Sequence, residues 1–300
     1  MFDVLLVIPF WCAFSYADDL TLIAPCISAA QKMLHVCEEY AEEYNVLFNS
    51  IQSCHLLYNT KCLRNVSLTL NGKALQTCKS AVHLGTVIGL NSHEVNVEKA
   101  INDLIHRTNV LMSKYSFCSS DVRVHLFLSF CSSYYGSSLW KLDTNSLLRL
   151  SVAWRKCVRR LLKVQYTTHS RYLPLIINKP DISIELLGRF NTFWSSCIDS
   201  PHKYVRFVTK MIHGSRSIVS DNLKVVLSYL NMEYGDYAML VQNRNVSKNV
   251  MIAKYKDKCN VEDIHACNVI KELLRYRDGQ VYIPLTKEEG NVLLTHLCIN

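Results

Sequence analysis

The sequence predicts an α+β fold, with a small antiparallel β region first and helices after it. Two observations predict this order. Before residue 90, short apolar runs rich in strand-forming residues flank turn signals such as Asp18-Asp19 and Asn71-Gly72. After residue 92, apolar residues recur at helical spacing in one segment after another. The composition agrees with a folded chain, because 300 residues with 49% hydrophobic content are enough for a buried core, and only 9 Gly and 6 Pro occur.

The first turn signal, Asp18-Asp19, lies between two apolar runs in the stretch 14–24. Those runs predict a tight hairpin that presents both carboxylates at its tip. Adjacent carboxylates repel each other unless a cation neutralises them. The pattern favours a divalent-metal site, which makes Asp18 and Asp19 candidate catalytic residues. The alternative is a solvated Asp-Asp turn between two strands.

The segment after this hairpin predicts a helix and then a second hairpin. Ser28-Ala29-Ala30-Gln31 has the pattern of a capping box, which opens a helix. Glutamates at positions 38, 39, 42 and 43 lie off the apolar stripe of this helix, and we expect them to form a solvated acidic face. Asn71-Gly72 follows an alternating run, and it predicts a hairpin because this pair tolerates the positive φ angles of a tight turn.

From residue 92 onward, helical periodicity dominates. We expect helices at about residues 97–115, 121–134, 144–164, 181–198, 205–212, 221–231 and 262–277, with a short last one that opens at Thr286.

The helix at 144–164 has an unusual distribution of charge. No acid lies between Asn145 and Gln165. A structural surface helix usually mixes signs to form pairs with residues one turn away, so a helix without acids fits a surface whose counter-charge comes from phosphates. We therefore expect nucleic-acid contact, and the alternative is a solvated basic face. The cations of this set are Arg149, Arg155, Lys156, Arg159, Arg160 and Lys163.

Composition limits the partners and the compartment. The formal charge of +8 suits a protein that meets a polyanion, and it equally suits a basic protein without such a partner. Thirteen scattered Cys without a Cys-x-x-Cys motif indicate a reduced intracellular compartment, nucleus or cytoplasm. No apolar run is long enough to cross a bilayer, so no membrane partner is expected. No cofactor-binding motif such as a phosphate-binding Gly-rich loop occurs.

The order of several motifs resembles the reverse transcriptases of LINE-type (non-LTR) retrotransposons, from about residue 14 to about residue 174. The resemblance lies in the order of the strings rather than in any one of them. These strings are Tyr16-Ala17-Asp18-Asp19, Asn49-Ser50-Ile51-Gln52-Ser53, Val82-His83-Leu84-Gly85, Tyr135-Gly136 with Leu139-Trp140, and Thr168-His169.

This resemblance implies a fold, a chemistry and partners. Residues 1–90 would be a partial polymerase palm with its Tyr-x-Asp-Asp hairpin, 91–170 a helical thumb-like region and 171–300 a helical C-terminal extension. Asp18 would be a ligand of Mg²⁺, and Asp19 its less strictly required neighbour. Gly85 would lie in the hairpin that positions the primer end, close to the nucleic-acid backbone. The partners of the parent enzyme are an RNA template and a DNA primer.

Departures from the family lead us to expect an inactive C-terminal fragment of such a reverse transcriptase. Gln52 stands where the family has a lysine, and an amide cannot donate a proton as an ammonium can. The family also supplies an essential Asp and a fingers subdomain upstream of its hairpin, and only thirteen residues precede Phe14. We expect residual, sequence-independent nucleic-acid binding through the 149–163 helix. The alternative is a helical nucleic-acid-binding or protein-interaction module without polymerase activity.

Overall fold

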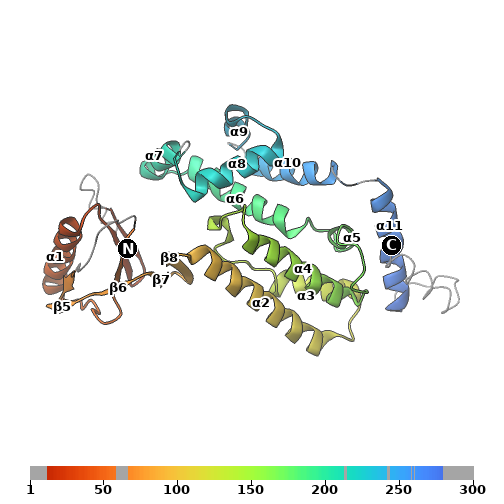
Figure 1. Ribbon diagram of the computed structural model, residues 1–300, viewed down its shortest axis with the longest axis horizontal. Coiled ribbons are helices and arrows are strands. Elements are labelled where there is room, and N and C mark those ends of the chain that lie inside the picture. The colour runs from red at the N-terminus through yellow and green to blue at the C-terminus, as the bar shows by residue number, and fades with distance from the viewer. Residues whose placement is uncertain are drawn as a thin grey trace. The chain divides into compact units, whose positions relative to one another are not determined.

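The computed structural model describes residues 12–58, 67–212, 215–241, 244–257, 259 and 261–279, and its fold is of the α+β class (Figure 1). The chain divides into two compact units, residues 1–92 and 93–300. Strands are found in the first unit, and the described part of the second unit is helical. The division at 92 lies close to the end of the β region expected from the sequence.

The first unit contains four small sheets, each with two strands among the described residues. Three of them are antiparallel hairpins, and the fourth pairs two strands in parallel. The hairpins are β1 (Cys12–Tyr16) with β2 (Asp19–Ile23), β4 (Thr69–Leu70) with β5 (Lys73–Ala74), and β7 (Ser80–His83) with β8 (Thr86–Gly89); the parallel pair is β3 (Cys54–Leu56) with β6 (Gln76–Cys78).

Helix α1 (Ile27–Tyr44) packs against β4, and a small apolar cluster of Leu68, Leu70 and Leu75 lies between them. The capping box expected at Ser28 and Gln31 is wrong. The helix begins at Ile27, and its N-cap residue Cys26 makes no side-chain capping bond. The amide of Gln31 instead bonds the backbone of Thr69 twice, since its Oε1 accepts from Thr69 N at 2.9 Å and its Nε2 donates to Thr69 O at 3.0 Å.

The turn between β4 and β5 is the one predicted from Asn71-Gly72. Both residues have positive φ, 52° and 69°. The backbone N–H of Asn71 donates to Glu38 Oε1, and its side chain donates to Phe48 O at 3.0 Å. Glu38 therefore stabilises this turn, whereas the sequence placed it on a solvated face. The mistake arises because the hairpin that reaches Glu38 is more than thirty residues away along the chain.

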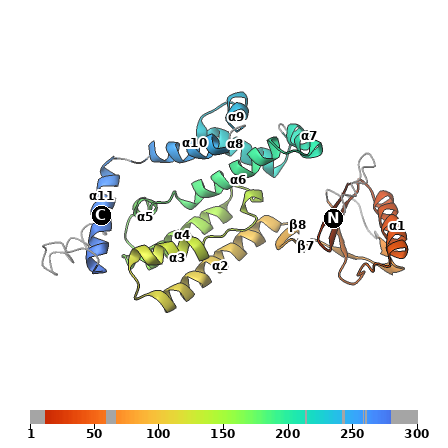
Figure 2. The same ribbon diagram turned by 180° about the vertical axis from the view of Figure 1, so that it is seen from behind.

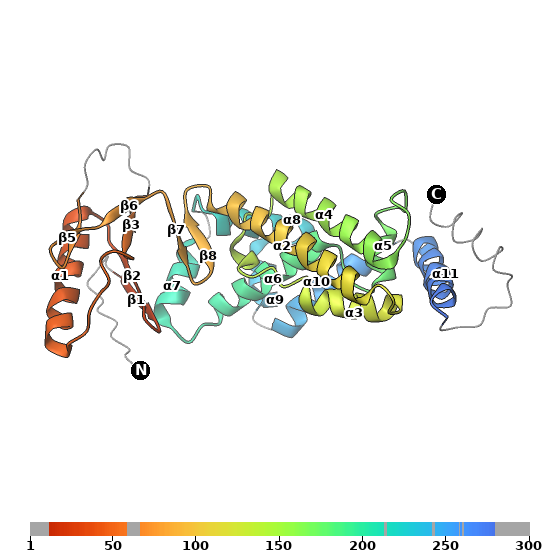
Figure 3. The ribbon, with the colours of Figure 1, turned by 90° about the horizontal axis from the view of Figure 1, so that it is seen from below.

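The second unit is built from ten α-helices and one short 3-10 helix, η1 (Ser137–Leu139), in its described part, and Figures 2 and 3 show the unit from two further sides. The ten α-helices are α2 (Ser92–Tyr115), α3 (Ser120–Phe130), α4 (Asn145–Leu162), α5 (Tyr172–Ile176), α6 (Ile182–Ile198), α7 (Lys203–Ile212), α8 (Ile218–Leu230), α9 (Tyr234–Val241), α10 (Arg244–Asp257) and α11 (Val261–Arg277). The sequence predicted seven of these and missed α5, α9 and α10. The short helix expected at Thr286 lies outside the described residues.

Two apolar clusters stabilise this unit. The larger one joins α2, α3, α4, α5 and α11 with the start of α6, and the smaller one joins α6, α8, α9 and α10. The apolar stripe predicted on α4 is confirmed, because Leu147, Leu150, Trp154, Val158 and Leu161 are all buried. The larger cluster also includes Leu173 and Ile176, so one core runs across the boundary expected at residue 170.

None of the helices in the described ranges has both the length and the apolar character needed to cross a lipid bilayer.

Candidate functional site

The hairpin of β1 and β2 presents Asp18 at its turn. Tyr16 pairs with Asp19, so Ala17 and Asp18 are the two residues of the turn. Ala17 has a φ of 53°, a left-handed conformation that few residues with a side chain adopt outside turns. Asp18 and Asp19 are both exposed. Solvent or a bound molecule can therefore reach both carboxylates.

These two carboxylates fit Mg²⁺ only in part. Among the residues that the structure describes, no group of three or more His, Cys, Asp or Glu side chains is arranged to hold a metal. Magnesium is commonly held by one or two carboxylates together with substrate phosphates and water, rather than by a cage made of protein groups alone. Two carboxylates would need a phosphate and water molecules to complete such a site, and the role of Asp18 and Asp19 as magnesium ligands stays a prediction.

The hairpin of β7 and β8 turns at Leu84 and Gly85. Both residues have positive φ, 47° and 75°, and the flanking residues His83 and Thr86 pair with each other. Gly85 suits this turn because glycine adopts a positive φ without steric cost. The structure thus explains Gly85 by the turn itself. The nucleic-acid contact that the resemblance implies for Gly85 stays a prediction.

The two hairpins meet through one side-chain contact. Thr21 Oγ1 of β2 lies 3.4 Å from His83 Nε2 of β7. Thr21 is two residues after Asp19, and His83 is two residues before Gly85. The structure therefore brings together the two hairpins that carry candidate residues of the first unit.

The segment 49–53 forms a local turn held by Asn49. Its Oδ1 accepts from the backbone N–H groups of Ile51 at 3.1 Å and Gln52 at 3.3 Å, and its carbonyl oxygen accepts from Ser53 Oγ at 2.8 Å. Asn49 and Ser53 are thus explained by the turn itself. The side chain of Gln52 is exposed.

The six cations predicted to contact nucleic acid, five on α4 and Lys163 at its C-cap, fall into two groups. The first group, Arg155 and Arg159, forms hydrogen bonds with other residues of the second unit. Arg155 donates twice to Asp181 Oδ2, from Nη2 at 2.9 Å and from Nε at 3.2 Å. Arg159 donates twice to the carbonyl oxygen of the fully buried Thr168, at 2.8 and 3.1 Å, and once to Ser170 Oγ at 2.9 Å. Burial, together with the charge of Arg155, lowers the pKa of Arg159. We attribute a structural role to both arginines.

The second group is exposed. Arg149 pairs with Glu98 at 2.7 Å, Arg160 donates to Asn109 Oδ1, and Lys163 Nζ donates to Ser116 O at 2.7 Å. Lys156 makes no hydrogen bond or ion pair with the residues that the structure describes. The sequence argument assumed that these cations lack counter-charges within the protein. Glu98 and Asp181 supply two, from α2 and from the N-cap of α6, so that assumption fails for Arg149 and Arg155.

A groove of about 540 Å³ lies between α2 and α4, on the surface where the exposed cations of α4 are found. Its floor is apolar, because the buried residues Ile101, Ala153 and Cys157 line it. The exposed side chains of Ile105, Leu148 and Val152 also line the groove. Arg149, Lys156 and Arg160 also line it. Sequence reasoning found these cations but missed the apolar groove beside them, because the groove depends on how α2 and α4 pack.

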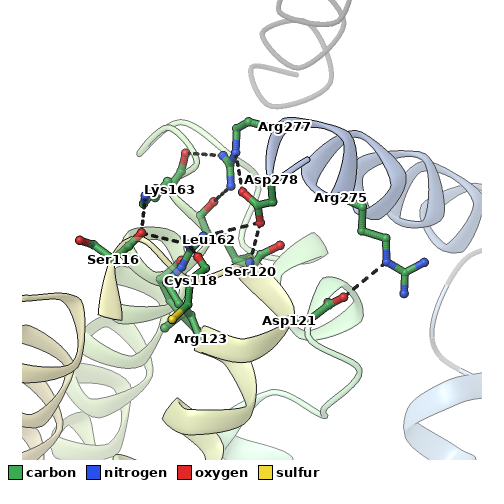
Figure 4. Close-up of polar contacts among 11 residues, drawn as sticks. Ser116, Cys118, Ser120, Asp121, Arg123, Leu162, Lys163, Arg275, Arg277 and Asp278 are labelled. Atoms are coloured by element: carbon green, nitrogen blue, oxygen red, sulfur yellow. Dashed lines mark hydrogen bonds and ion pairs between the residues drawn. The ribbon is translucent and has the colours of Figure 1, made fainter. Parts of the chain in front are cut away.

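Lys163 belongs to a cluster of polar contacts where α4 ends (Figure 4). The last carbonyl groups of α4 have no partner within the helix. Arg277 donates to Leu162 O at 2.8 Å and to Lys163 O at 3.1 Å, and Arg123 Nε donates to Leu161 O at 2.8 Å. Cationic side chains are favoured at this end of a helix.

Arg123 and Asp278 complete this cluster. Arg123 is almost fully buried and also donates to Ser116 O at 3.3 Å and to Cys118 O. Asp278 accepts from the backbone N–H of Ser120 in the first turn of α3, and it lies 4.0 Å from Arg123 Nη2 (Figure 4). Sequence reasoning missed both residues, because only the packed structure brings Asp278 to Ser120.

Comparisons with protein-family models, with curated proteins and with solved structures found no match to this chain.

Proposed function

We propose that this chain is part of a LINE-type reverse transcriptase and that, by itself, it binds nucleic acid without adding nucleotides. The arrangement of two hairpins in the first unit supports the proposal most directly. Asp18 stands at an exposed two-residue turn, and the strand that follows it contacts the Gly85 hairpin through Thr21 and His83. The motif order from residue 14 to residue 174 supports the same lineage.

In this proposal Asp18, with Asp19 beside it, would hold Mg²⁺ together with the phosphates of an incoming nucleotide. The ion would stabilise the charge that develops on the phosphoryl group being transferred. Two-metal transfer also needs carboxylates from separate strands, and Asp18 and Asp19 come from one hairpin. The exposed Gln52 cannot supply the proton that a lysine would. We therefore propose no polymerisation by this chain alone.

Primer extension on an RNA template, with and without a divalent metal, tests the inactivity. No nucleotide incorporation is expected from this chain under either condition. Incorporation that disappears in Asp18→Ala would overturn the proposal. Nucleic-acid binding is measured on the same preparation, so that an unfolded sample is not mistaken for an inactive one.

The nucleic-acid contact is proposed at the exposed cations of α4, and Lys156 is the sharpest test because it has no described partner. Lys156→Glu should weaken binding to an RNA–DNA duplex by roughly tenfold and reduce the slope of log affinity against log salt by about one. The control is Lys224→Glu on α8, which makes the same change in net charge at another exposed lysine. Equal effects of both variants, or no effect of either, would contradict a contact at α4.

A second candidate function is a protein-interaction module, and the apolar floor of the α2–α4 groove favours it. Nucleic-acid interfaces are polar and strongly positive. This groove instead exposes apolar side chains to solvent, and Leu148 is 65% exposed. An amphipathic helix with acidic residues would fit a groove with an apolar floor and cations along it. The duplex titration separates the two functions, because no measurable binding by the unaltered chain would favour the protein partner.

A further inference from the structure

Helix α7 (Lys203–Ile212) exposes its apolar side. Tyr204, Phe207, Val208 and Met211 lie at positions i, i+3, i+4 and i+7, which share one face of a helix. Phe207, Val208 and Met211 are 60%, 51% and 63% exposed. A surface helix normally buries such a face against the core. In the described part of this unit nothing covers it.

Another side of α7 attaches it to the unit. Thr209 is the buried residue of this helix, and Ile212, one turn further on, packs against the smaller apolar cluster. Arg206 donates to Ser200 O, and α7 packs on α6 (Figure 2). The helix is thus anchored through Thr209, Ile212 and Arg206, and the side that carries Phe207, Val208 and Met211 stays exposed.

The charged residues of α7 are all positive, and the nearest acids in the sequence are Asp199 and Asp221. No Asp or Glu occurs from Ser200 to Ser220, whereas Lys203, Arg206 and Lys210 lie on α7 itself. Lys203 and Lys210 are exposed, and Lys203 Nζ lies 5.1 Å from the ring centre of Tyr204. These lysines border the apolar face on the side of Phe207, since positions 203, 207 and 210 are neighbours on a helix.

We propose that α7 binds the surface of an anionic lipid bilayer, with its axis parallel to the surface. Phe207, Val208 and Met211 enter the boundary between headgroups and acyl chains, and Lys203 and Lys210 contact anionic headgroups. An apolar face with cations along its edge is the pattern of helices that lie in this interface. Such a helix needs no run long enough to cross the bilayer, so the sequence criterion that argued against a membrane partner does not apply to it.

Two other occupants fit α7 less well. A nucleic acid would satisfy the lysines, but it would gain little from Val208 and Met211, because nucleic-acid interfaces are more polar than this face. A second copy of α7, packed face to face in the antiparallel direction, would place the lysines of both copies along the same edge, where like charges repel.

Sedimentation of the full chain with phospholipid vesicles tests the proposal. The chain should bind vesicles of phosphatidylcholine with about one-third phosphatidylserine, bind pure phosphatidylcholine at least tenfold more weakly, and release from the anionic vesicles as salt rises. Val208→Asp should abolish the binding. Its control is Val122→Asp on α3, at a valine that is 46% exposed, and this variant should bind as the unaltered chain does.

A second pair of variants tests the charges. Lys203→Glu with Lys210→Glu should weaken binding to the anionic vesicles at least tenfold, whereas Lys99→Glu with Lys224→Glu, which change the net charge equally, should weaken it far less. Circular dichroism of each variant checks that the helices are intact. Equal binding by Val208→Asp and Val122→Asp, binding to neither vesicle, or binding of a single-stranded oligonucleotide that Val208→Asp removes would each overturn the lipid proposal.

Discussion

The two units of this chain are stabilised in different ways. In the first unit, tight turns at Ala17-Asp18, Asn71-Gly72 and Leu84-Gly85 close three of the four sheets of two strands. Its apolar cluster is small. In the second unit, two extensive apolar clusters and buried polar side chains connect segments that are far apart in the sequence.

This difference shows which structural features can be predicted from the sequence and which depend on packing. Turns set by two neighbouring residues are visible in the sequence, and three hairpins of the first unit contain them, whereas the contacts of Gln31 and Glu38 with the Asn71-Gly72 hairpin are not visible in this way. Contacts such as Arg123 with the end of α4 depend on the packed arrangement of several helices. Substitutions in the second unit should therefore have the larger effects, and they should affect the whole unit.

The largest effect is expected from Arg123→Met. This substitution leaves three carbonyl groups without the donor Arg123, whereas Asp278 keeps its contacts with Arg277 and Ser120, so we expect a loss of about 3–5 kcal/mol in unfolding free energy. Urea unfolding followed by tryptophan fluorescence measures it. In a Trp11→Phe background the remaining tryptophans, Trp140, Trp154 and Trp194, all report on the second unit. A similarly large loss in Arg149→Met, which removes only an exposed ion pair, would contradict the assignment.

The next effect separates two adjacent arginines of α4. Arg159→Ala leaves the buried carbonyl of Thr168 without its donor, and should cost about 2 kcal/mol. Arg160→Ala removes an exposed contact to Asn109 and should change stability by less than about 0.5 kcal/mol. The same unfolding measurement checks both. If the two variants were equally stable, the division of the α4 cations into structural and exposed groups would be wrong.

A smaller and local effect is expected in the first unit from Gly89→Ala. Gly89 has a φ of 120°, and a Cβ there would lie 2.4 Å from Lys79 O, so we expect the β7–β8 hairpin to loosen by about 2 kcal/mol. Hydrogen exchange in a peptide covering 80–90 reports it. Gly188→Ala in α6 is the control, because nothing lies within 4 Å of its Cβ and alanine favours a helix. Protection in the second unit should stay unchanged in Gly89→Ala.

The smallest effect concerns pH. Burial tends to raise the pKa of Asp278, but the hydrogen bonds from Ser120 and the charges of Arg277 and Arg123 lower it overall. A carboxyl whose pKa is lowered by folding stabilises the fold above its ordinary titration range, and that stability is lost as the pH falls through this range and below it. Asp278→Asn should therefore flatten the acid side of the stability profile, measured as urea midpoints from neutral to acidic pH. An unchanged acid slope would exclude Asp278 as a contributor.

The sequence predicted the fold class, most of the helices and the apolar stripe of α4, because these depend on periodicity. It also predicted the Asn71-Gly72 turn, which two residues determine. It failed at Gln31 and Glu38, whose partners lie on a hairpin more than thirty residues further on. For the candidate site, it found the six cations of α4 but could not tell that Arg155 and Arg159 face Asp181 and Thr168. The role of Asp18 and Asp19 stays a prediction.

The contact between Asp278 and Ser120 has a consequence for how the chain folds while it is being synthesised. Helix α3 is complete in sequence by residue 130, yet the acceptor for its first N–H group, that of Ser120, arrives 158 residues later. In the same way, the carbonyl groups of Leu162 and Lys163 at the end of α4 have no donor until Arg277 has been synthesised. The ribosome must therefore release most of the second unit before these two helices gain their last stabilising contacts, and until then water must satisfy these backbone groups.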